Sequence, residues 1–281
     1  MKTIERAEYA GFCYGVRRAL KLAEQELSEN NGLPVFILGP LIHNAQVNQK
    51  LESQGLKIVN DLEDLKAGVF LVPSHGLSKS QIEKIRDRGL KICDATCPHV
   101  KKVQNLAYNL AEEGYQVIIV GDEQHSEVKG IKGWIEKDNT VIVAGKEEIA
   151  SLKLSSRAGL VVQTTQSAKR LGEVIAEVIP RVKELKAYNT ICLATKERQS
   201  AAVALADRVD IMIVIGGKNS ANTKRLAELC SDKTQSVYHI ETAAELQEIW
   251  FKDKERVGIT AGASTPEWLI AEVEEQIKKF F

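Results

Sequence analysis

The sequence predicts an α/β fold made of three similar units, each with a small parallel sheet. Short apolar segments alternate with helical patterns along the chain, which is typical of parallel strands joined by right-handed crossovers. The chain also resembles itself at a long period. Cys13, Cys97 and Cys192 each precede a helical pattern, and Gly39, Gly121 and Gly216 end the apolar segment that follows each helix.

The first α/β unit is predicted over residues 14–96. A helix follows Cys13, with Val16, Ala19 and Leu20 on one face, and a strand at 35–38 ends in the polar loop that holds His43. The remaining segments are a helix from about residue 46, a strand at 56–59, an acidic helix start at 61–64 and a strand at 69–72 that ends near His75.

The second unit is predicted over residues 97–191 and repeats this order. Pro98 suits the first turn of the helix that follows Cys97. The remaining segments are strands at 117–120, 140–143 and 159–162, a helix at 146–152, and a long amphipathic helix toward Cys192. The charge run at 183–186 is expected on a solvated helix face.

The third unit is predicted over residues 192–281. Its strands are expected at 211–215, 237–240 and 256–260, with a helix through Leu246 and a terminal helix. A fourth strand is missing after the third, and the 1–13 segment, through residues 2–9, is expected to complete the unit. Without Gly/Ser/Pro-rich linkers, the units are expected to pack around a pseudo-threefold axis and a central cluster cavity.

Composition excludes several classes of partner. Lys+Arg and Asp+Glu are both 38, so the formal net charge is zero and gives no general attraction to nucleic acid or to an acidic membrane surface. The first six residues lack the apolar core of a signal peptide, and no apolar run approaches the roughly 20 residues of a membrane helix. We therefore expect a cytoplasmic protein.

Three of the five cysteines require a functional explanation. In a reducing compartment they are better interpreted as ligands, nucleophiles or core residues than as disulfides; Cys93 and Cys230 are expected in the core. Cys13, Cys97 and Cys192 occupy equivalent strand-to-helix positions. Three thiolates suit an iron–sulfur cluster with one fewer ligand than usual, which leaves one iron open to substrate. The alternative is three cysteines buried in repeat cores.

The loops after the strands hold polar residues that suit a phosphate or diphosphate. These are His43, His75, His125, Ser220, Asn222 and Ser264. Glu127 is the carboxyl group best placed to move protons, and Thr164 and Thr165 come from the loop after another strand of the same unit, so a relay from Thr to Glu is plausible. The alternative role for Glu127 is to stabilise a helix start.

These motifs resemble the LytB/IspH family of 4-hydroxy-3-methylbut-2-enyl diphosphate reductases. GFCYGV, DATCPHV, HSEV, QTT, TICLAT followed by RQ, GGKNSANT and TAGAS all occur in family order and cover nearly the whole chain. The resemblance implies three α/β units around a [4Fe-4S] cluster held by Cys13, Cys97 and Cys192 with one open iron. It also implies a substrate site, whose residues are His43, His75, His125, Thr164, Thr165, Ser220, Ala221, Asn222 and Ser264. Of these, His43, His75, His125, Ser220, Asn222 and Ser264 resemble the family's diphosphate site, and Thr164 is expected near the substrate hydroxyl.

The resemblance also implies a reaction, the last step of the methylerythritol phosphate route to isoprenoids. The allylic hydroxyl of the diphosphate substrate binds the open iron, Glu127 delivers protons through Thr164, and two electrons release the oxygen as water, giving isopentenyl and dimethylallyl diphosphate. The electrons are expected singly from an external donor of the ferredoxin or flavodoxin type. One departure is Ala221, where the family can carry a second serine, so any contact there must come from backbone.

Two rival functions stay open at the level of sequence. One is a three-cysteine enzyme such as a quinolinate synthase, in which the open iron serves condensation and dehydration; the diphosphate-type loops and HSEV argue against it. The other is a non-catalytic iron or redox sensor, which would not need Glu127 or the loop of Ser220 and Asn222. An enzyme assay separates all three.

Overall fold

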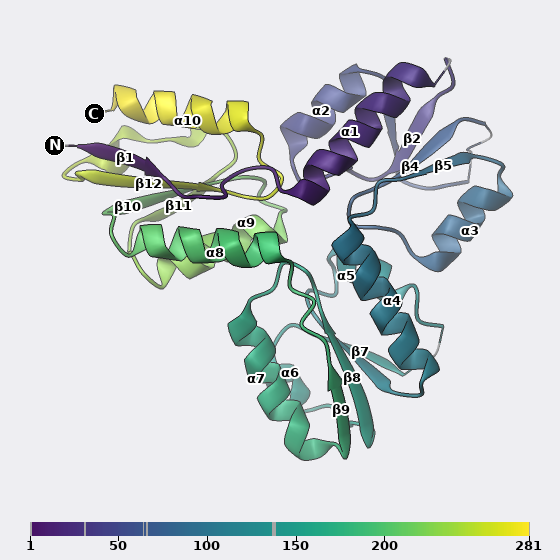
Figure 1. Ribbon diagram of the computed structural model, residues 1–281. Helices are drawn as coiled ribbons and strands as arrows, with labels where there is room; N and C mark the ends of the chain where they lie inside the picture. The colour runs from purple at the N-terminus through teal and green to yellow at the C-terminus, as the bar shows by residue number, and fades with distance from the viewer. Residues whose placement is uncertain (1, 31, 64, 66, 137–138, 281) are drawn as a thin grey trace. The chain divides into compact units, whose positions relative to one another are not determined.

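The chain divides into two compact parts. The computed structural model describes residues 2–30, 32–63, 65, 67–136 and 139–280. Part I consists of Met1–Arg17, Ile42–Lys50 and Leu193–Phe281, and part II consists of Arg18–Leu41 and Leu51–Cys192. Figure 1 shows the elements in chain order, from purple at the N-terminus to yellow at the C-terminus.

Short strands alternate with helices, as the sequence predicts. The strands are β1 (Thr3–Arg6), β2 (Val35–Leu38), β3 (Leu56–Val59), β4 (Val69–Val72), β5 (Lys91–Asp94), β6 (Gln116–Val120), β7 (Thr140–Val143), β8 (Arg157–Val162), β9 (Glu184–Ala187), β10 (Ile211–Ile215), β11 (Val237–Ile240) and β12 (Arg256–Ala261). The α-helices are α1 (Tyr14–Glu29), α2 (Ala45–Ser53), α3 (Lys79–Asp87), α4 (Pro98–Glu112), α5 (Ser126–Lys132), α6 (Lys146–Ile149), α7 (Ala168–Val178), α8 (Leu193–Ala206), α9 (Ala221–Ser231) and α10 (Glu267–Lys279).

The strands form three parallel sheets with the same topology. Their orders are β3-β2-β4-β5, β7-β6-β8-β9 and, read from the opposite edge, β11-β10-β12-β1. Every strand pair within them is parallel. In the third sheet the N-terminal strand takes the fourth place, with Thr3 opposite Arg256 and Arg6 opposite Ile259. The predicted α/β class is confirmed. As expected, the N-terminal segment supplies the fourth strand that is missing after β12.

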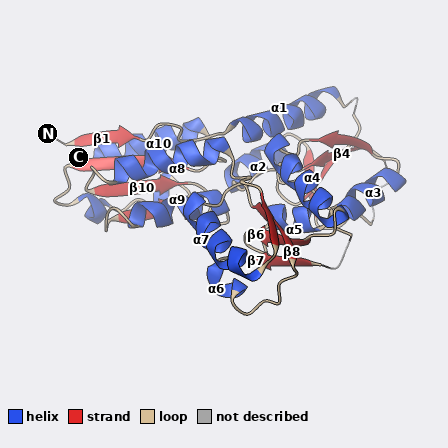
Figure 2. Cartoon of the chain, turned by 60° about the horizontal axis from the view of Figure 1, so that its bottom comes forward, coloured by secondary structure: helices blue, strands red, loops and turns tan. Residues whose placement is uncertain are grey.

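Part I has one apolar core on each face of its sheet. Along β10, Ile211, Ile213 and Ile215 face one core, which α10 completes with Leu269 and Ile270 among others. The alternate residues of β10 pack against α8 and α9. This alternation follows from the strand period of two, and a parallel sheet covered on both faces reads as a continuous apolar run. Figure 2 shows β10 among these helices.

Part II holds the other two sheets. In the sheet of β6 to β9, Ile118 and Val120 pack on the side of α6 and α7, whereas Val117 and Ile119 pack on the side of α4 and α5. In the sheet of β2 to β5, Phe70 packs with residues of α3 and its flanking loops. The carboxyl ends of the strands thus carry the loops in which the sequence places its candidate site residues.

Three local predictions are wrong. The run at 183–186, expected on a helix, contributes to the edge strand β9, after α7 ends at Val178 and a 3₁₀ turn follows. Residues 61–63 are not helical, and Asp64 lies outside the described residues. Instead of one helix through Leu246, two 3₁₀ helices span Ala243–Glu245 and Glu248–Phe251.

Each sheet takes its strands from one of the three predicted units. The strands β2 to β5 lie within 14–96, β6 to β9 lie within 97–191, and β10 to β12 lie within 192–281, with β1 from the 1–13 segment. The domain boundaries themselves, the pseudo-threefold axis and the central cavity stay predictions.

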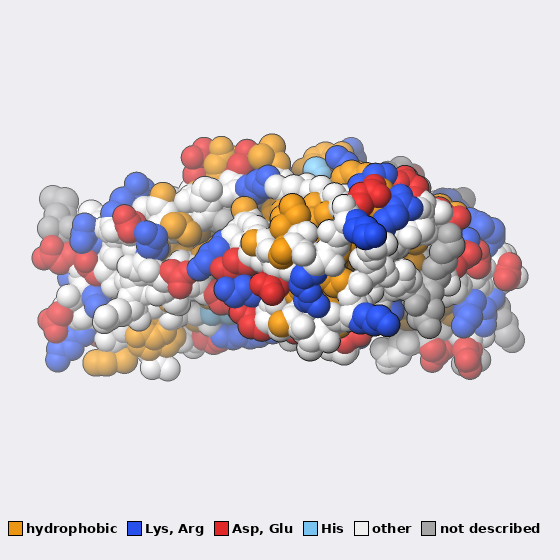
Figure 3. Space-filling model, turned by 90° about the horizontal axis from the view of Figure 1, so that it is seen from below, with side chains coloured by type: hydrophobic (Ala, Val, Ile, Leu, Met, Phe, Trp, Pro, Cys, Tyr) orange, Lys and Arg blue, Asp and Glu red, His pale blue; other side chains and the backbone are white. Residues whose placement is uncertain are grey.

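The surface carries both signs of charge. Figure 3 shows Lys and Arg side chains interspersed with Asp and Glu on the face it presents, as expected for a chain with a formal net charge of zero. Among the described residues, no helix is long and apolar enough to cross a membrane.

Candidate active site

Each of the three candidate ligand cysteines comes immediately before a helix. Cys13 precedes α1, Cys97 precedes α4 and Cys192 precedes α8, and each lies in the connection that leaves the fourth strand of its sheet. Backbone N–H groups are unpaired at a helix start and favour negative charge. The amide of Val16 points at the Cys13 sulfur, with a distance of 3.5 Å from N to Sγ.

The backbone of each cysteine is tied to the loop after the third strand of a sheet. The amide of Cys13 donates to the carbonyl of Ala263 (3.1 Å), that of Cys97 to Ser74 (2.9 Å) and that of Cys192 to Thr164 (3.0 Å). Ser74 precedes His75 and Ala263 precedes Ser264. Each candidate ligand is therefore hydrogen-bonded to a loop that carries a candidate substrate residue.

Exposure separates the five cysteines into two groups. Cys93 and Cys230 are buried, whereas Cys13, Cys97 and Cys192 are partly exposed, and all five are free of disulfides. Burial raises the pKa of the Cys93 thiol to about 11 and that of Cys230 to about 12, which makes them poor thiolates. The three equivalent cysteines are therefore less buried than Cys93 and Cys230, and their role as ligands stays a prediction.

The three cysteines are divided between the two parts. Cys13 belongs to part I, and Cys97 and Cys192 belong to part II. Within the described ranges, no group of three or more His, Cys, Asp or Glu side chains is gathered at metal-binding spacing. Convergence of the three sulfurs therefore stays a prediction.

Glu127 and Thr164 form a buried pair in part II. The amide of Thr164 donates to Oε1 of Glu127 (2.7 Å), and the Thr164 hydroxyl donates to Oε2 (2.8 Å). Glu127 is 3% exposed. Burial raises its pKa to about 7, because desolvation of the carboxylate outweighs the two hydrogen bonds from Thr164, which lower the pKa. A carboxyl group of this kind holds and releases a proton near neutral pH.

The two predicted histidines of part II lie close to the helix that carries Glu127. His125 caps α5, and its Nδ1 accepts a hydrogen bond from the Glu127 amide (3.2 Å). His75 is buried, and a Cβ built at Gly130 of α5 would lie 3.4 Å from the His75 carbonyl oxygen. The helix α5 therefore connects Glu127 with both histidine loops.

In part I the structure brings His43 and Ser264 together. The Ser264 hydroxyl donates to the His43 carbonyl (3.1 Å). A Cβ at Gly217 would lie 2.6 Å from that same carbonyl oxygen, so only glycine allows the loop before Ser220 to approach so closely. Desolvation lowers the pKa of His43, which favours a neutral imidazole.

The first turn of α9 presents a buried polar surface. Ser220 caps this helix by accepting from the Thr223 amide (3.3 Å). Asn222 is 5% exposed, and among the described residues neither its side-chain nitrogen nor its oxygen has a hydrogen-bond partner. A buried amide left in this state is costly unless a ligand satisfies it. A ligand at this helix N-terminus, where anions bind, would satisfy these atoms; the role of Asn222 in binding substrate stays a prediction.

The remaining predicted residues follow these contacts. Ala221 is the first residue of α9, where its backbone can face an anion, and Thr165 follows Thr164 and is partly exposed. Sequence reasoning missed the buried Gln163, whose Oε1 accepts from the Asp122 amide (3.1 Å), and gave no role to the buried Arg198. The only signal was their place in the QTT and RQ motifs.

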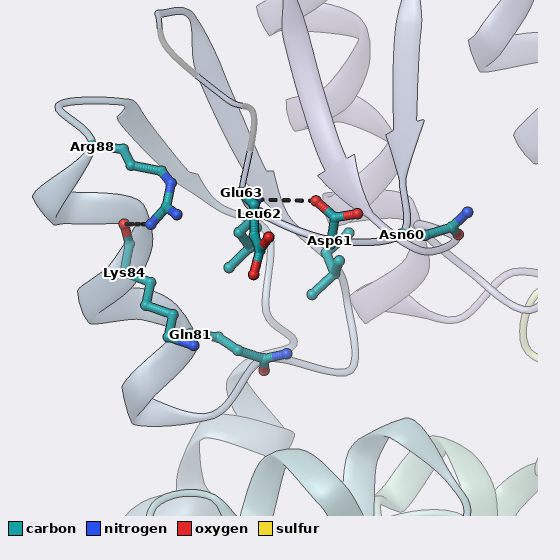
Figure 4. A pocket seen from close by; sticks show the side chains of 8 residues that line it. Asn60, Asp61, Leu62, Glu63, Gln81, Lys84 and Arg88 are labelled. Atoms are coloured by element: carbon teal, nitrogen blue, oxygen red, sulfur yellow. Dashed lines mark hydrogen bonds between the residues drawn. The ribbon is translucent and has the colours of Figure 1, made fainter.

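Two surface pockets lie apart from the predicted site residues. The first, about 230 Å³, is lined by Asp61, Glu63, Lys84 and Arg88 among others. Figure 4 shows that Arg88 binds the backbone of Lys84 and that the Glu63 amide binds Asp61. The second, about 470 Å³, lies beside the stacked rings of Tyr238 and Trp250. Neither includes a predicted site residue.

Comparison with known proteins places this geometry in a family. The family model described as LytB protein matches residues 4–278. A 4-hydroxy-3-methylbut-2-enyl diphosphate reductase of Geobacter sulfurreducens is 50% identical over 98% of this chain and 96% of its own length. Its counterpart from Aquifex aeolicus is 45% identical over 97% and 95%.

Solved structures agree with this result. An (E)-4-hydroxy-3-methyl-but-2-enyl diphosphate reductase, described as the terminal enzyme of the non-mevalonate pathway, matches with a TM-score of 0.72 at 45% identity, covering 99% of this chain and 100% of the other. The E-1-hydroxy-2-methyl-but-2-enyl-4-diphosphate reductase of Plasmodium falciparum matches with a TM-score of 0.90 at 27% identity, covering 99% and 87%.

The fold and the candidate site together define a class of α/β protein. Its members have three equivalent parallel sheets, a cysteine before the helix that follows the fourth strand of each sheet, and a buried acid hydrogen-bonded to a hydroxyl group. The chain belongs to the LytB family. The family resemblance inferred from the motifs is confirmed.

Proposed function

We propose that this chain reduces 4-hydroxy-3-methylbut-2-enyl diphosphate to isopentenyl and dimethylallyl diphosphate. The observation that carries the proposal is the pair of Glu127 and Thr164. Glu127 is a buried acid with a pKa of about 7 that accepts two hydrogen bonds from Thr164, and the Thr164 carbonyl accepts one from the Cys192 amide. Full-length relatives named for this reductase support the same assignment. The reaction takes two electrons and two protons, breaks the allylic C–O bond, forms a C–H bond and releases water.

The donor set fits a [4Fe-4S] cluster with one open iron. Cys13, Cys97 and Cys192 form no disulfide, are partly exposed and lie at helix starts, and soft thiolates are the ligands such clusters take. When bound, the cluster would supply the two electrons one at a time and a Lewis-acidic position for the hydroxyl group. An external one-electron carrier of the ferredoxin or flavodoxin type would provide these electrons.

The residues of this chain bind the substrate and handle the protons. The Thr164 hydroxyl donates to Glu127 (2.8 Å) and can pass a proton between this acid and the leaving hydroxyl. Asn222 and the start of α9, with Ser220 and Ser264, would hold the diphosphate in part I. His75 and His125, close to α5, would contribute further donors in part II. Cysteines that form no disulfide also suit a reducing compartment, so we expect a cytoplasmic enzyme.

The deciding experiment is anaerobic turnover of the hydroxylated diphosphate by reconstituted protein with a chemical reductant. We expect both isomeric products, roughly four irons per chain in the wild type, and little iron in C13S, C97S and C192S. C93A is the matched control, because Cys93 is buried and lies outside the predicted ligand set. Normal iron in all three ligand variants would reject the assignment of the cysteines, and iron without turnover would reject the reductase.

A further inference from the structure

Two arginines bind the backbone of the loops that lead to candidate ligand cysteines. Arg18 of α1 donates through Nη1 to the carbonyl of Thr96 and through Nη2 to that of Asp94, each at 3.2 Å. Thr96 comes directly before Cys97. The Arg18 guanidinium thus holds two carbonyls of the Cys97 loop at once.

Arg198 of α8 binds in a comparable way within part I. Its Nη2 donates to the carbonyl of Gly11 (2.7 Å) and its Nη1 to that of Ala194 (3.0 Å). Gly11 lies two residues before Cys13, and Ala194 lies in the first turn of α8. One guanidinium therefore connects the Cys13 loop to the helix start that follows Cys192.

The burial of Arg198 makes its charge significant. Arg198 is only 3% exposed, and a guanidinium stays protonated even when buried. Two carbonyls can be held by a neutral amide, so hydrogen bonding alone does not require a cation. A fixed positive charge in a region of low dielectric stabilises added negative charge nearby, and reduction of a cluster adds one.

We propose that Arg18 and Arg198 are positioning residues for the Cys97 and Cys13 loops, and that the charge of Arg198 raises the reduction potential of the bound cluster. The proposal rests on the proposed function, because it presumes that these cysteines hold the cluster. Arg18 is partly exposed, so we assign it the positioning role alone.

The test compares R198Q, R198K and R18Q with two surface controls. R208Q removes an exposed arginine just after α8 that pairs with Glu5, and K21Q removes an exposed lysine from α1. The readouts are the rate of iron release to a chelator under anaerobic conditions and the midpoint potential from a spectroscopic redox titration. Iron uptake by the wild type is measured first.

We expect iron release to be about tenfold faster in R198Q and R18Q, because the loss of one charge-assisted hydrogen bond corresponds to a change of about this size. The rate should be unchanged in both controls. The potential should be more negative in R198Q, and near the wild-type value in R198K, which keeps the charge but not the planar two-carbonyl geometry. R198K should still release iron faster than the wild type.

The outcomes separate the two roles. If R198Q and R18Q match their controls in iron release, the positioning role is overturned; if R198K has the lowered potential of R198Q, the charge role is overturned. If R198Q does not fold, as judged by circular dichroism, R18Q and R198K carry the test. A wild-type chain without iron would overturn the proposed function instead. The positioning of the Cys13 loop by Arg198 would then be tested by comparing the thermal unfolding of iron-free R198Q with that of R208Q.

Discussion

At the scale of single residues, Glu127 combines the properties that a proton donor needs. It is enclosed in the protein, yet both carboxylate oxygens bind Thr164 at 2.7 and 2.8 Å. Because burial raises the pKa of Glu127 from 4.5 to about 7, the group is largely protonated below pH 7 and charged above it. Only the protonated form can donate.

We therefore predict that kcat falls as pH rises through about 7, and that Glu127→Gln removes this dependence along with most of the activity. Loss of a positioned acid lowers turnover by about 100-fold or more, with little change in KM. Steady-state kinetics of both proteins between pH 5.5 and 9 check this. As a control, the wild type is assayed in more than one buffer at the same pH, to show that the buffer does not affect kcat. Near-normal turnover of the variant would show that Glu127 is not the donor.

The sequence predicts a set of candidate site residues, but it misses others whose contacts in the candidate site only the structure shows. The cysteines at three equivalent positions and the carboxyl group of Glu127 in HSEV stand out, because few other residue types can ligate an iron–sulfur cluster or transfer a proton. Gln163, Arg18 and Arg198 do not stand out, because amides and arginines are common on protein surfaces, and only the fold shows that Gln163 and Arg198 are buried.

At the scale of elements, helix starts carry most of the candidate chemistry. Ser220 caps α9 and Ser78 caps α3 through equal distances of 3.3 Å to the amide three residues on. Ser78 lies outside the predicted site and completes a capping box with Gln81. The two serines therefore form a matched pair that separates capping from substrate binding.

We predict that Ser220→Ala and Ser78→Ala each lower the free energy of unfolding by about 1 kcal/mol, the usual contribution of a cap. Only Ser220→Ala should also raise KM, by about tenfold, through the loss of a hydrogen bond to a charged group. Denaturant unfolding and steady-state kinetics measure the two effects. Equal KM values in the two variants would remove Ser220 from the substrate site.

Elements that the sequence misses are those with few buried residues. In β9 no residue is fully buried, and a short charged edge strand resembles the exposed face of a helix. The turn after β11 forms a capping box between Thr242 and Glu245 that favours a helix start, yet the helix stops after one 3₁₀ turn. Local patterns do not contain the tertiary pairing that decides both cases.

At the scale of the whole molecule, the same strand order recurs in all three sheets, and the sequence repeat predicts it. The third sheet is complete only because β1 pairs with β12, an arrangement that the Arg6 and Glu267 ion pair (2.5 Å) reinforces. Ile4 also packs against the adjoining core. The compact division into two parts, by contrast, depends on contacts that no repeat period reveals.

We predict that deleting residues 2–6 destabilises part I selectively. The lost strand pairing is worth on the order of 3 kcal/mol if each ladder hydrogen bond contributes about 1 kcal/mol. Protection of β12 amides against hydrogen exchange should then fall about 100-fold, whereas the amides of β6 and β8 in part II should keep their protection and serve as an internal control. A uniform loss over all sheets, or none, would contradict this prediction.

The hydrogen bond from the Cys13 amide to Ala263 also has a consequence for biogenesis. During translation Cys13 is made about 250 residues before Ala263, its partner in this hydrogen bond. Newly made protein must therefore wait, without this backbone hydrogen bond at Cys13, until the sheet of β10 to β12 has formed, so the proposed cluster would bind after that step.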